Sequence, residues 1–296
     1  MTTRRISLHL MLPLLLALGC GAADSDSNDE LTENLEVSPD DAGKADHAGA
    51  YRMKASRSRT LFGGRSTTLA FDILDASGQP VTAFDLDHTK LFHLIVVSED
   101  LSYFSHIHPT YVGDGRFTVR WTPPVFDDRY HLYAQFHPTG GAEQTRRVNL
   151  AVPGTSIKTP VPLAADTTDS KRSGNNVLMS EQTSPLRTGA QTVGFMVHDA
   201  RTGELATDLE PFLGAHAHLI GVQANVGGRG FQHAHDMGGA ASTGGGHSGH
   251  GGGASMDASG ALSFDVRFPV AGLYRLWVQY RRAGRDVTQF FTVAVR

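Results

Sequence analysis

The stretch Gly230-Phe231-Gln232-His233-Ala234-His235-Asp236 is an aromatic residue followed by a His-x-His pair. It has an earlier counterpart in Tyr103-Phe104-Ser105-His106-Ile107-His108-Pro109. A further histidine precedes each pair in an apolar segment, His93 in the first case and His218 in the second. Because the same arrangement of three histidines occurs twice, we predict a duplicated unit built around these imidazoles.

The segments around the histidines also repeat, in the same order. Each copy has an alternating apolar segment, a glycine turn, a tyrosine-led apolar segment and a closing alternating segment. The pairs are 67–75 with 192–199, 75–79 with 199–204, 130–136 with 274–280, and 148–152 with 291–295. Alternation with a period of two is the pattern of half-buried strands, and no convincing helical period accompanies it. We therefore expect an antiparallel β-sandwich in each copy.

Tyr274 makes the expected fold more specific. Residues 272–276 read Gly-Leu-Tyr-Arg-Leu, which resembles the tyrosine corner of immunoglobulin-like domains, where a tyrosine early in a late strand bonds back to a preceding loop. The first copy departs from this pattern, with Asp128 and Arg129 before Tyr130. The predicted fold class is all-β, with two tandem antiparallel immunoglobulin-like β-sandwich domains.

Residues 1–19 are interpreted as a signal peptide, because Arg4 and Arg5 precede a short apolar run. The run ends in Ala17-Leu18-Gly19-Cys20, which resembles the lipobox of bacterial lipoproteins. That resemblance implies that Cys20, the sole cysteine of the chain, is lipidated and anchors the protein to a membrane. A plain signal peptide cut nearby is the alternative.

The remaining chain divides by composition. Residues 21–46 carry nine acidic side chains against one lysine, a composition typical of a disordered tether. We place the lipidated, disordered tether at 20–50, the first sandwich at 51–152, a linker with room for a short strand or two at 153–187, and the second sandwich at 188–296 with a Gly/His-rich loop at 237–259. The net charge of −4 comes from the acidic tether, so the folded part offers no basic surface for nucleic acid.

The histidines are the candidate chemical groups. Residues two apart in a strand point to the same side, so each His-x-His pair presents two imidazoles together. A third imidazole from a neighbouring strand completes a three-nitrogen site that suits Zn(II) or Cu(II). The predicted metal ligands are His216, His218, His233 and His235 in the second copy, and His93, His106 and His108 in the first.

Two residues distinguish the second copy. His216 is taken as an optional fourth ligand, and Asp236 as either a ligand or the acceptor that orients an imidazole. His247 and His250, in the glycine-rich loop, resemble the histidines of loops that capture ions weakly. A competing interpretation remains open for the repeated histidines: they are ordinary core residues bonded to backbone carbonyls, which a duplication would preserve equally well.

The repeated pattern also resembles a known group of proteins. His-Leu-Ile-Val-Val-Ser-Glu-Asp from His93, Phe-x-His-x-His-Pro from Phe104 and Tyr-x-Leu-x-x-Gln-Phe from Tyr130 are similar to exported bacterial immunoglobulin-like domains associated with heavy-metal handling. The second copy departs from them with residues 223–225 in place of Ser-Glu-Asp and Asp236 in place of proline. The resemblance implies a β-sandwich in a metal-handling setting.

Residues 230–235 show a further resemblance, to the Gly-Phe-His-x-His signature of copper/zinc superoxide dismutase. Here Gln232 is inserted before the first histidine. That enzyme also has a disulfide, which a chain with one cysteine cannot form. Dismutase activity is therefore kept as a minor alternative.

From these patterns we predict a non-catalytic, lipid-anchored protein of the cell envelope, on the outer membrane or its periplasmic face, that buffers or delivers Cu(II) or Zn(II). Its expected partners are the membrane, through Cys20, and a metal donor or acceptor protein. The alternative is a structural or adhesive immunoglobulin-like surface module whose histidines are packing residues.

Overall fold

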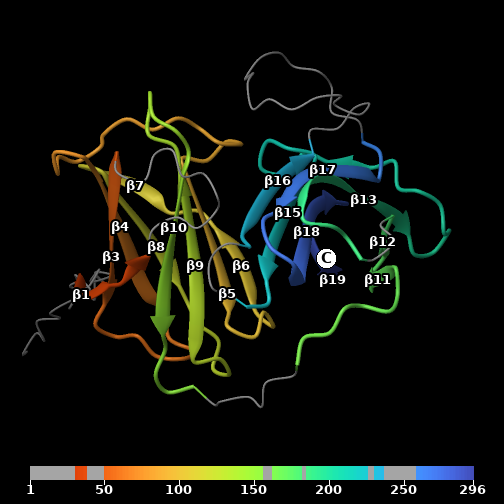
Figure 1. The fold of residues 1–296 in the computed structure, drawn as a ribbon, viewed down its shortest axis with the longest axis horizontal. Coiled ribbons are helices and arrows are strands. Elements are labelled where there is room, and N and C mark those ends of the chain that lie inside the picture. Colours follow the sequence, from red (N-terminus) through yellow and green to blue (C-terminus); the bar gives the residue numbers. More distant parts are fainter. Residues whose placement is uncertain (1–30, 39–49, 156–161, 182–184, 226–229, 237–257) are drawn as a thin grey trace, which may run out of the picture.

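Two β-sandwiches lie side by side in the computed structural model, the first coloured orange to green and the second mainly cyan to blue (Figure 1). The structure describes residues 31–38, 50–155, 162–181, 185–225, 230–236 and 258–296. All the regular elements in these ranges are strands, which confirms the predicted all-β fold class. The signal peptide, Cys20 and loop residues 237–257 lie outside the described residues. Within the described ranges no helix is long and apolar enough to cross a membrane.

The first sandwich consists of two antiparallel sheets, with strand orders β1-β3-β4-β8-β7 and β2-β10-β9-β5-β6. Its strands are β1 (Leu31–Leu35), β2 (Val37–Ser38), β3 (Tyr51–Ser58), β4 (Thr67–Asp75), β5 (Phe92–Ser98), β6 (Phe104–Ile107), β7 (Thr110–Gly113), β8 (Arg116–Trp121), β9 (Arg129–Phe136) and β10 (Gln144–Ala151).

The second sandwich repeats this plan, with one sheet ordered β11-β12-β13-β17 and the other β14-β18-β15-β16, in which β19 also pairs with β18. Its strands are β11 (Ser170–Ser173), β12 (Asn176–Ser180), β13 (Gly189–Asp199), β14 (Leu209–Glu210), β15 (Ala217–Gln223), β16 (Gln232–Asp236), β17 (Ala261–Phe268), β18 (Gly272–Arg282) and β19 (Arg285–Val295).

Strand β4 illustrates how the alternating pattern builds each core. Its Leu69, Phe71 and Ile73 are fully buried between the two sheets of the first sandwich. The matching side chains of β13 enter the core of the second sandwich. Burying such a side chain stabilises the fold by about 1.5–3 kcal/mol relative to exposure, so the chain needs no disulfide to hold these sheets together.

Residues 31–38 differ from the predicted disordered tether. Strand β1 pairs with β3, and β2 pairs with β10. Leu35 and Val37 pack against the first core, so two apolar contacts and the backbone pairing order a segment whose acidic composition predicts disorder.

The predicted linker at 153–187 also ends earlier than expected. Strands β11 and β12 form a hairpin, and β12 extends the sheet by pairing with β13. The turn between them contains Gly174, which has a φ of +54° that glycine adopts without steric cost. Leu178 of β12 is fully buried in the second core. The second domain therefore begins near residue 170, because β11 and β12 extend its sheet and Leu178 packs in its core.

A third apolar cluster joins the two sandwiches, and we call it the interdomain cluster. Strand β5 is buried along its whole length because its two faces meet different partners: Leu94 faces its own core, whereas Ile95 faces the second domain. Strand β15 behaves in the same way up to Val222, and Gln223 at its end is half-buried. The buried members of the interdomain cluster are Ile95, Val97, Leu101, Tyr133, Ile220, Val222, Phe231 and Trp277.

Two stacked aromatic pairs fix the interface. The ring of Phe104 stacks on Trp277, with centroids 4.8 Å apart, and the ring of Tyr133 stacks on Phe231, with centroids 4.4 Å apart. Phe104 and Phe231 occupy the same position of the repeated motif, as do Tyr133 and Trp277. Each stack is therefore the repeat of the other, and the two domains pack through the same face in the manner of an isologous pair.

Tyr274 forms the predicted tyrosine corner. Its hydroxyl donates to the carbonyl oxygen of Val270 at 2.9 Å. In the first copy, the buried hydroxyl of Tyr130 has no hydrogen-bond partner among the described residues. The first copy, in which Asp128 and Arg129 precede Tyr130, thus lacks the hydrogen bond of the tyrosine corner.

We expect Tyr274→Phe to lower the free energy of unfolding by about 1 kcal/mol, because the corner bond is lost. The midpoint of thermal unfolding should fall by roughly 2–4 °C, measured by circular dichroism. The matched control is Tyr130→Phe, which removes a hydroxyl without a partner and should not lower the midpoint. Equal losses in the two variants would contradict the assignment of the corner.

Candidate metal centre

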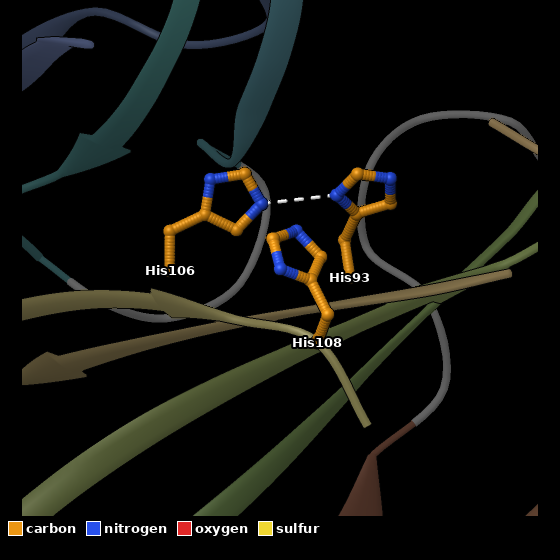
Figure 2. A group of neighbouring side chains, drawn as sticks. All are labelled: His93, His106 and His108. Atoms are coloured by element: carbon orange, nitrogen blue, oxygen red, sulfur yellow. Dashed lines mark hydrogen bonds between the residues drawn. The ribbon is translucent and has the colours of Figure 1, made fainter. Parts of the chain in front are cut away.

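Three histidines of the first domain converge, and we call them triad one. His93 comes from β5, His106 from β6, and His108 follows β6 on the same side. One nitrogen of each ring lies within 4.8 Å of the other two. Figure 2 shows the three rings turned toward a common space. The arrangement follows from strand alternation, which places every second residue after Phe104 on the interface side.

The second domain repeats the arrangement, and we call the set triad two. It consists of His218 from β15 with His233 and His235 from β16, again with ligand nitrogens within 4.8 Å of one another. Six of the seven predicted ligands therefore come together in two groups, each of which can hold a metal ion. His216 belongs to neither group.

Some of the nitrogen pairs inside the triads have the spacing of ligands around a metal ion. His93 Nδ1 lies 3.0 Å from His106 Nε2, the dashed contact of Figure 2. In triad two, His218 Nδ1 lies 3.3 Å from His233 Nε2, and His235 Nε2 lies 3.1 Å from that same atom. A tetrahedral Zn(II) with nitrogens at 2.0–2.1 Å separates neighbouring ligand atoms by about 3.3 Å.

Backbone carbonyls hold the far nitrogen of one ring in each triad. His93 Nε2 donates to the carbonyl of Asp87, and His218 Nε2 donates to the carbonyl of Phe212, both at 3.0 Å. A carbonyl only accepts hydrogen bonds, so the proton of each neutral ring lies on Nε2. The Nδ1 atom of the same ring then carries a lone pair directed into the triad.

The side-chain oxygens of two glutamines fix the tautomer of a second ring in each triad. His106 Nδ1 lies 2.8 Å from Gln279 Oε1, and His233 Nδ1 lies 2.6 Å from Gln135 Oε1. The amide nitrogen of Gln135 donates to the carboxylate of Glu143, which can only accept, so the amide oxygen faces His233. Each glutamine belongs to the domain opposite the histidine that it orients.

The carbonyl and glutamine oxygens outside each triad, which we call the outer acceptors, bind the N–H groups of two rings. The inner nitrogens of these two rings therefore face each other with lone pairs in both triads. Two neutral rings held in these tautomers cannot share a proton between inner nitrogens that are 3.0–3.3 Å apart. A metal ion can accept both lone pairs while every outer hydrogen bond is kept. His108 Nε2 is buried without a partner among the described residues, which is the kind of atom that a bound ion satisfies.

Burial keeps these rings neutral. Desolvation, reinforced by neighbouring imidazoles, lowers the pKa of His106 to about 3 and that of His108 to about 2. Desolvation is also the largest cause of the lowered pKa values of His93, His218, His233 and His235. Neutral imidazole is the form that binds metal ions, so all six rings are in the ligand state near neutral pH.

His216 and Asp236 form a separate contact. His216 Nδ1 lies 3.3 Å from Asp236 Oδ2, and the same carboxylate oxygen accepts the backbone N–H of Ser263. Asp236 points to the opposite face of β16 from His233 and His235, because adjacent strand residues alternate. The prediction of His216 as a fourth ligand is therefore not met, and Asp236 orients His216 instead of a ring of triad two.

His88 is a neighbour of triad two that the sequence patterns did not identify. Its ring centroid lies 3.7 Å from that of His235, and Asp87, His88 and His235 form a third group with ligand atoms within 4.8 Å of one another. His88 has a φ of +43°, and its counterpart Leu213 has a φ of +51°. The Asp87-His88 doublet was visible in the sequence, but its approach to His235 exists only across the domain interface.

The structure thus defines a class of protein: a tandem pair of immunoglobulin-like β-sandwiches with a histidine triad on each facing surface. The family described as "Domain of unknown function (DUF8832)" matches residues 45–154 and again residues 170–296. The chain belongs to this family and carries its domain twice. The second match begins where β11 begins, in agreement with the boundary found in the structure.

No curated protein matches the sequence. Among solved structures, native Escherichia coli alpha-2-macroglobulin is 12% identical over 88% of this chain with a TM-score of 0.27, and the chain spans 15% of that protein. A tandem of titin immunoglobulin domains is 10% identical, with a TM-score of 0.17, over 83% of this chain and 98% of its own. A bacterial ice-binding adhesin is 8% identical, with a TM-score of 0.22, over 89% of this chain and 99% of its own. Similarity at this level carries no functional inference.

We expect the metal-free protein to lose stability as the pH falls below about 6.5. Below this value the unfolded chain takes up protons on the six imidazoles, whereas the folded chain keeps them neutral because burial lowers their pKa values. As the pH falls, each such ring lowers the free energy of unfolding by up to about 1.4 kcal/mol per pH unit, until the pH reaches the pKa of that ring in the folded chain. The stabilisation is fully present above the unfolded pKa.

Urea unfolding between about pH 7.5 and pH 5 measures this effect. The variant His218→Asn lacks one fully buried ring and should show a shallower dependence on pH, whatever its absolute stability. A free energy of unfolding that is constant across the range would contradict the burial of neutral rings.

Proposed function

We propose that this protein binds Cu(II) or Zn(II) at its two histidine triads and buffers or delivers the ion without catalysing a reaction. The proposal rests on one observation: inside each triad, two ring nitrogens face each other and both carry lone pairs. Both copies use the same outer acceptors, a backbone carbonyl for His93 and His218 and a glutamine oxygen for His106 and His233. A purely structural network would have given the inner nitrogens a proton to share.

The ligand set favours a borderline divalent ion. Three imidazole nitrogens without a thiolate suit Zn(II) and Cu(II), and Cu(II) has the higher intrinsic affinity for such a site. Three protein ligands leave a coordination position open to water or to an incoming ligand. An open position suits transfer of the ion to or from a partner protein better than permanent storage.

The location is also part of the proposal. We infer that the protein is anchored in the cell envelope through a lipid on Cys20, in the Leu-Gly-Cys context at the end of the apolar run. Anchoring would keep the metal-binding domains next to the membrane that exported them. A metal donor or acceptor protein of the envelope would then be the partner.

A structural or adhesive surface module is the second candidate. The interdomain cluster favours it, because eight buried side chains hold the two domains together without any metal. In that case the triads would be packing networks, and metal analysis separates the two functions.

We expect the purified protein to retain one ion in each triad after dialysis against metal-free buffer, measured by plasma mass spectrometry. The variant His233→Ala with His235→Ala should lose the ion of triad two and keep that of triad one. The matched control is His131→Ala with His198→Ala, which removes two histidines that bond to Asn149 and to the Gly203 carbonyl. Equal metal content in all three proteins would contradict binding at triad two.

We expect the full chain, expressed in a bacterial host, to fractionate with membranes and to incorporate labelled palmitate. The substitution Cys20→Ser removes the only thiol and should release the protein into the soluble envelope fraction without the label. A wild-type chain that is unlabelled and soluble would contradict the lipid anchor and leave the plain signal peptide.

A further inference from the structure

The two triads lie as close to each other as the rings within one triad. The centroid of His233 lies 5.2 Å from that of His93 and 5.3 Å from that of His106, and His106 lies 5.9 Å from His218. Within triad two, the centroids of His218 and His233 are 5.5 Å apart. The six imidazoles therefore form one continuous cluster across the domain interface.

The glutamines cross this interface in both directions. Gln135 of β9 orients His233 of triad two, and Gln279 of β18 orients His106 of triad one. Both glutamines are buried, with 6% and 8% of their surface exposed. Each domain supplies the ligands of its own triad and one carbonyl acceptor, but the glutamine acceptor of each triad comes from the other domain.

Asp87 lies beside both triads. Its backbone carbonyl accepts the N–H of His93 in triad one, while its carboxylate is grouped with His88 and His235 beside triad two. Two divalent ions among six neutral rings would bring positive charge into a buried site, and such charge needs a compensating partner. Within the described part of the chain, Asp87 is the carboxylate grouped with these histidines.

We propose that the two triads form one paired-metal centre across the domain interface, in which each domain orients a ligand of the other. This inference rests on the proposed metal binding. In paired-metal sites the ions lie about 3.5–4 Å apart and share one environment. The stacks of Phe104 on Trp277 and of Tyr133 on Phe231 hold the two facing sheets in register, so the spacing is set by packing before any ion binds.

Cu(II) is the probe for pairing, because two nearby Cu(II) ions have interacting electron spins. The chain is loaded in a His247→Ala, His250→Ala background, which removes the histidines of the Gly/His-rich loop. With both triads filled, electron paramagnetic resonance should show a half-field transition or a loss of the signal of isolated Cu(II). Adding His106→Ala and His108→Ala should leave one ion with an ordinary isolated spectrum.

An isolated spectrum from the doubly loaded chain would overturn the pairing while leaving the proposed function intact. A chain that binds neither Cu(II) nor Zn(II) would overturn the proposed function itself. Separate titrations with each ion therefore distinguish the two failures.

The crossed glutamines are tested by affinity. In the chain that keeps only triad two, Gln135→Met should weaken Zn(II) binding by roughly 10–100-fold, because the acceptor of His233 is lost. Gln279→Met is the matched control: it lies in the same domain as triad two but orients only the removed His106. Thermal unfolding midpoints of both variants show whether either one loosens the fold.

Weaker binding in the Gln135 variant alone, with similar midpoints, supports the crossed arrangement. Equal weakening by both substitutions, or no weakening by Gln135→Met, would overturn it.

Discussion

Packing between the outer faces of the β5–β9 and β15–β18 sheets is the interaction on which the rest of the structure depends. It covers strands such as β5 that are apolar on both sides and would otherwise expose one face to water. The same contact buries His93 and His218, half-buries the other triad histidines, and brings residues of distant sequence within hydrogen-bond distance. The interface therefore holds the two domains together and also encloses the candidate site.

The triads impose a cost on the metal-free fold. Each buried ring must stay neutral and find partners for two nitrogens, yet the inner nitrogens meet lone pair against lone pair. One ring must then give up its outer acceptor or take a proton against the effect of burial. An ion bound to the inner nitrogens would remove that conflict without moving the outer partners, and the proposed metal binding would then stabilise the interface.

The duplication is close but not complete. The carbonyl acceptors, the glutamines and the aromatic stacks repeat in both copies. The position of His88 is occupied by Leu213 in the second domain, although both residues adopt a left-handed backbone. As a result, triad two has an additional imidazole and a carboxylate beside it, and the surroundings of the two triads are chemically different.

The sequence by itself determined what depends on neighbours along the chain. Alternation with a period of two placed Phe104, His106 and His108 on one face, and the repeat of that pattern predicted two sandwiches with equivalent histidines. The tyrosine corner at Tyr274 was also visible, because its acceptor lies four residues away.

Only the tertiary structure decided what depends on burial by distant segments. Strand β1 forms because a sheet edge accepts it, against the prediction from its acidic composition, and β11 adds to a sheet edge within the segment predicted as a linker. Gln135 meets His233 across 98 positions of sequence, and no local pattern encodes such a contact. Whether two histidine triads are separate or joined is set by the packing of two sheet faces, since that packing alone fixes the distance between them.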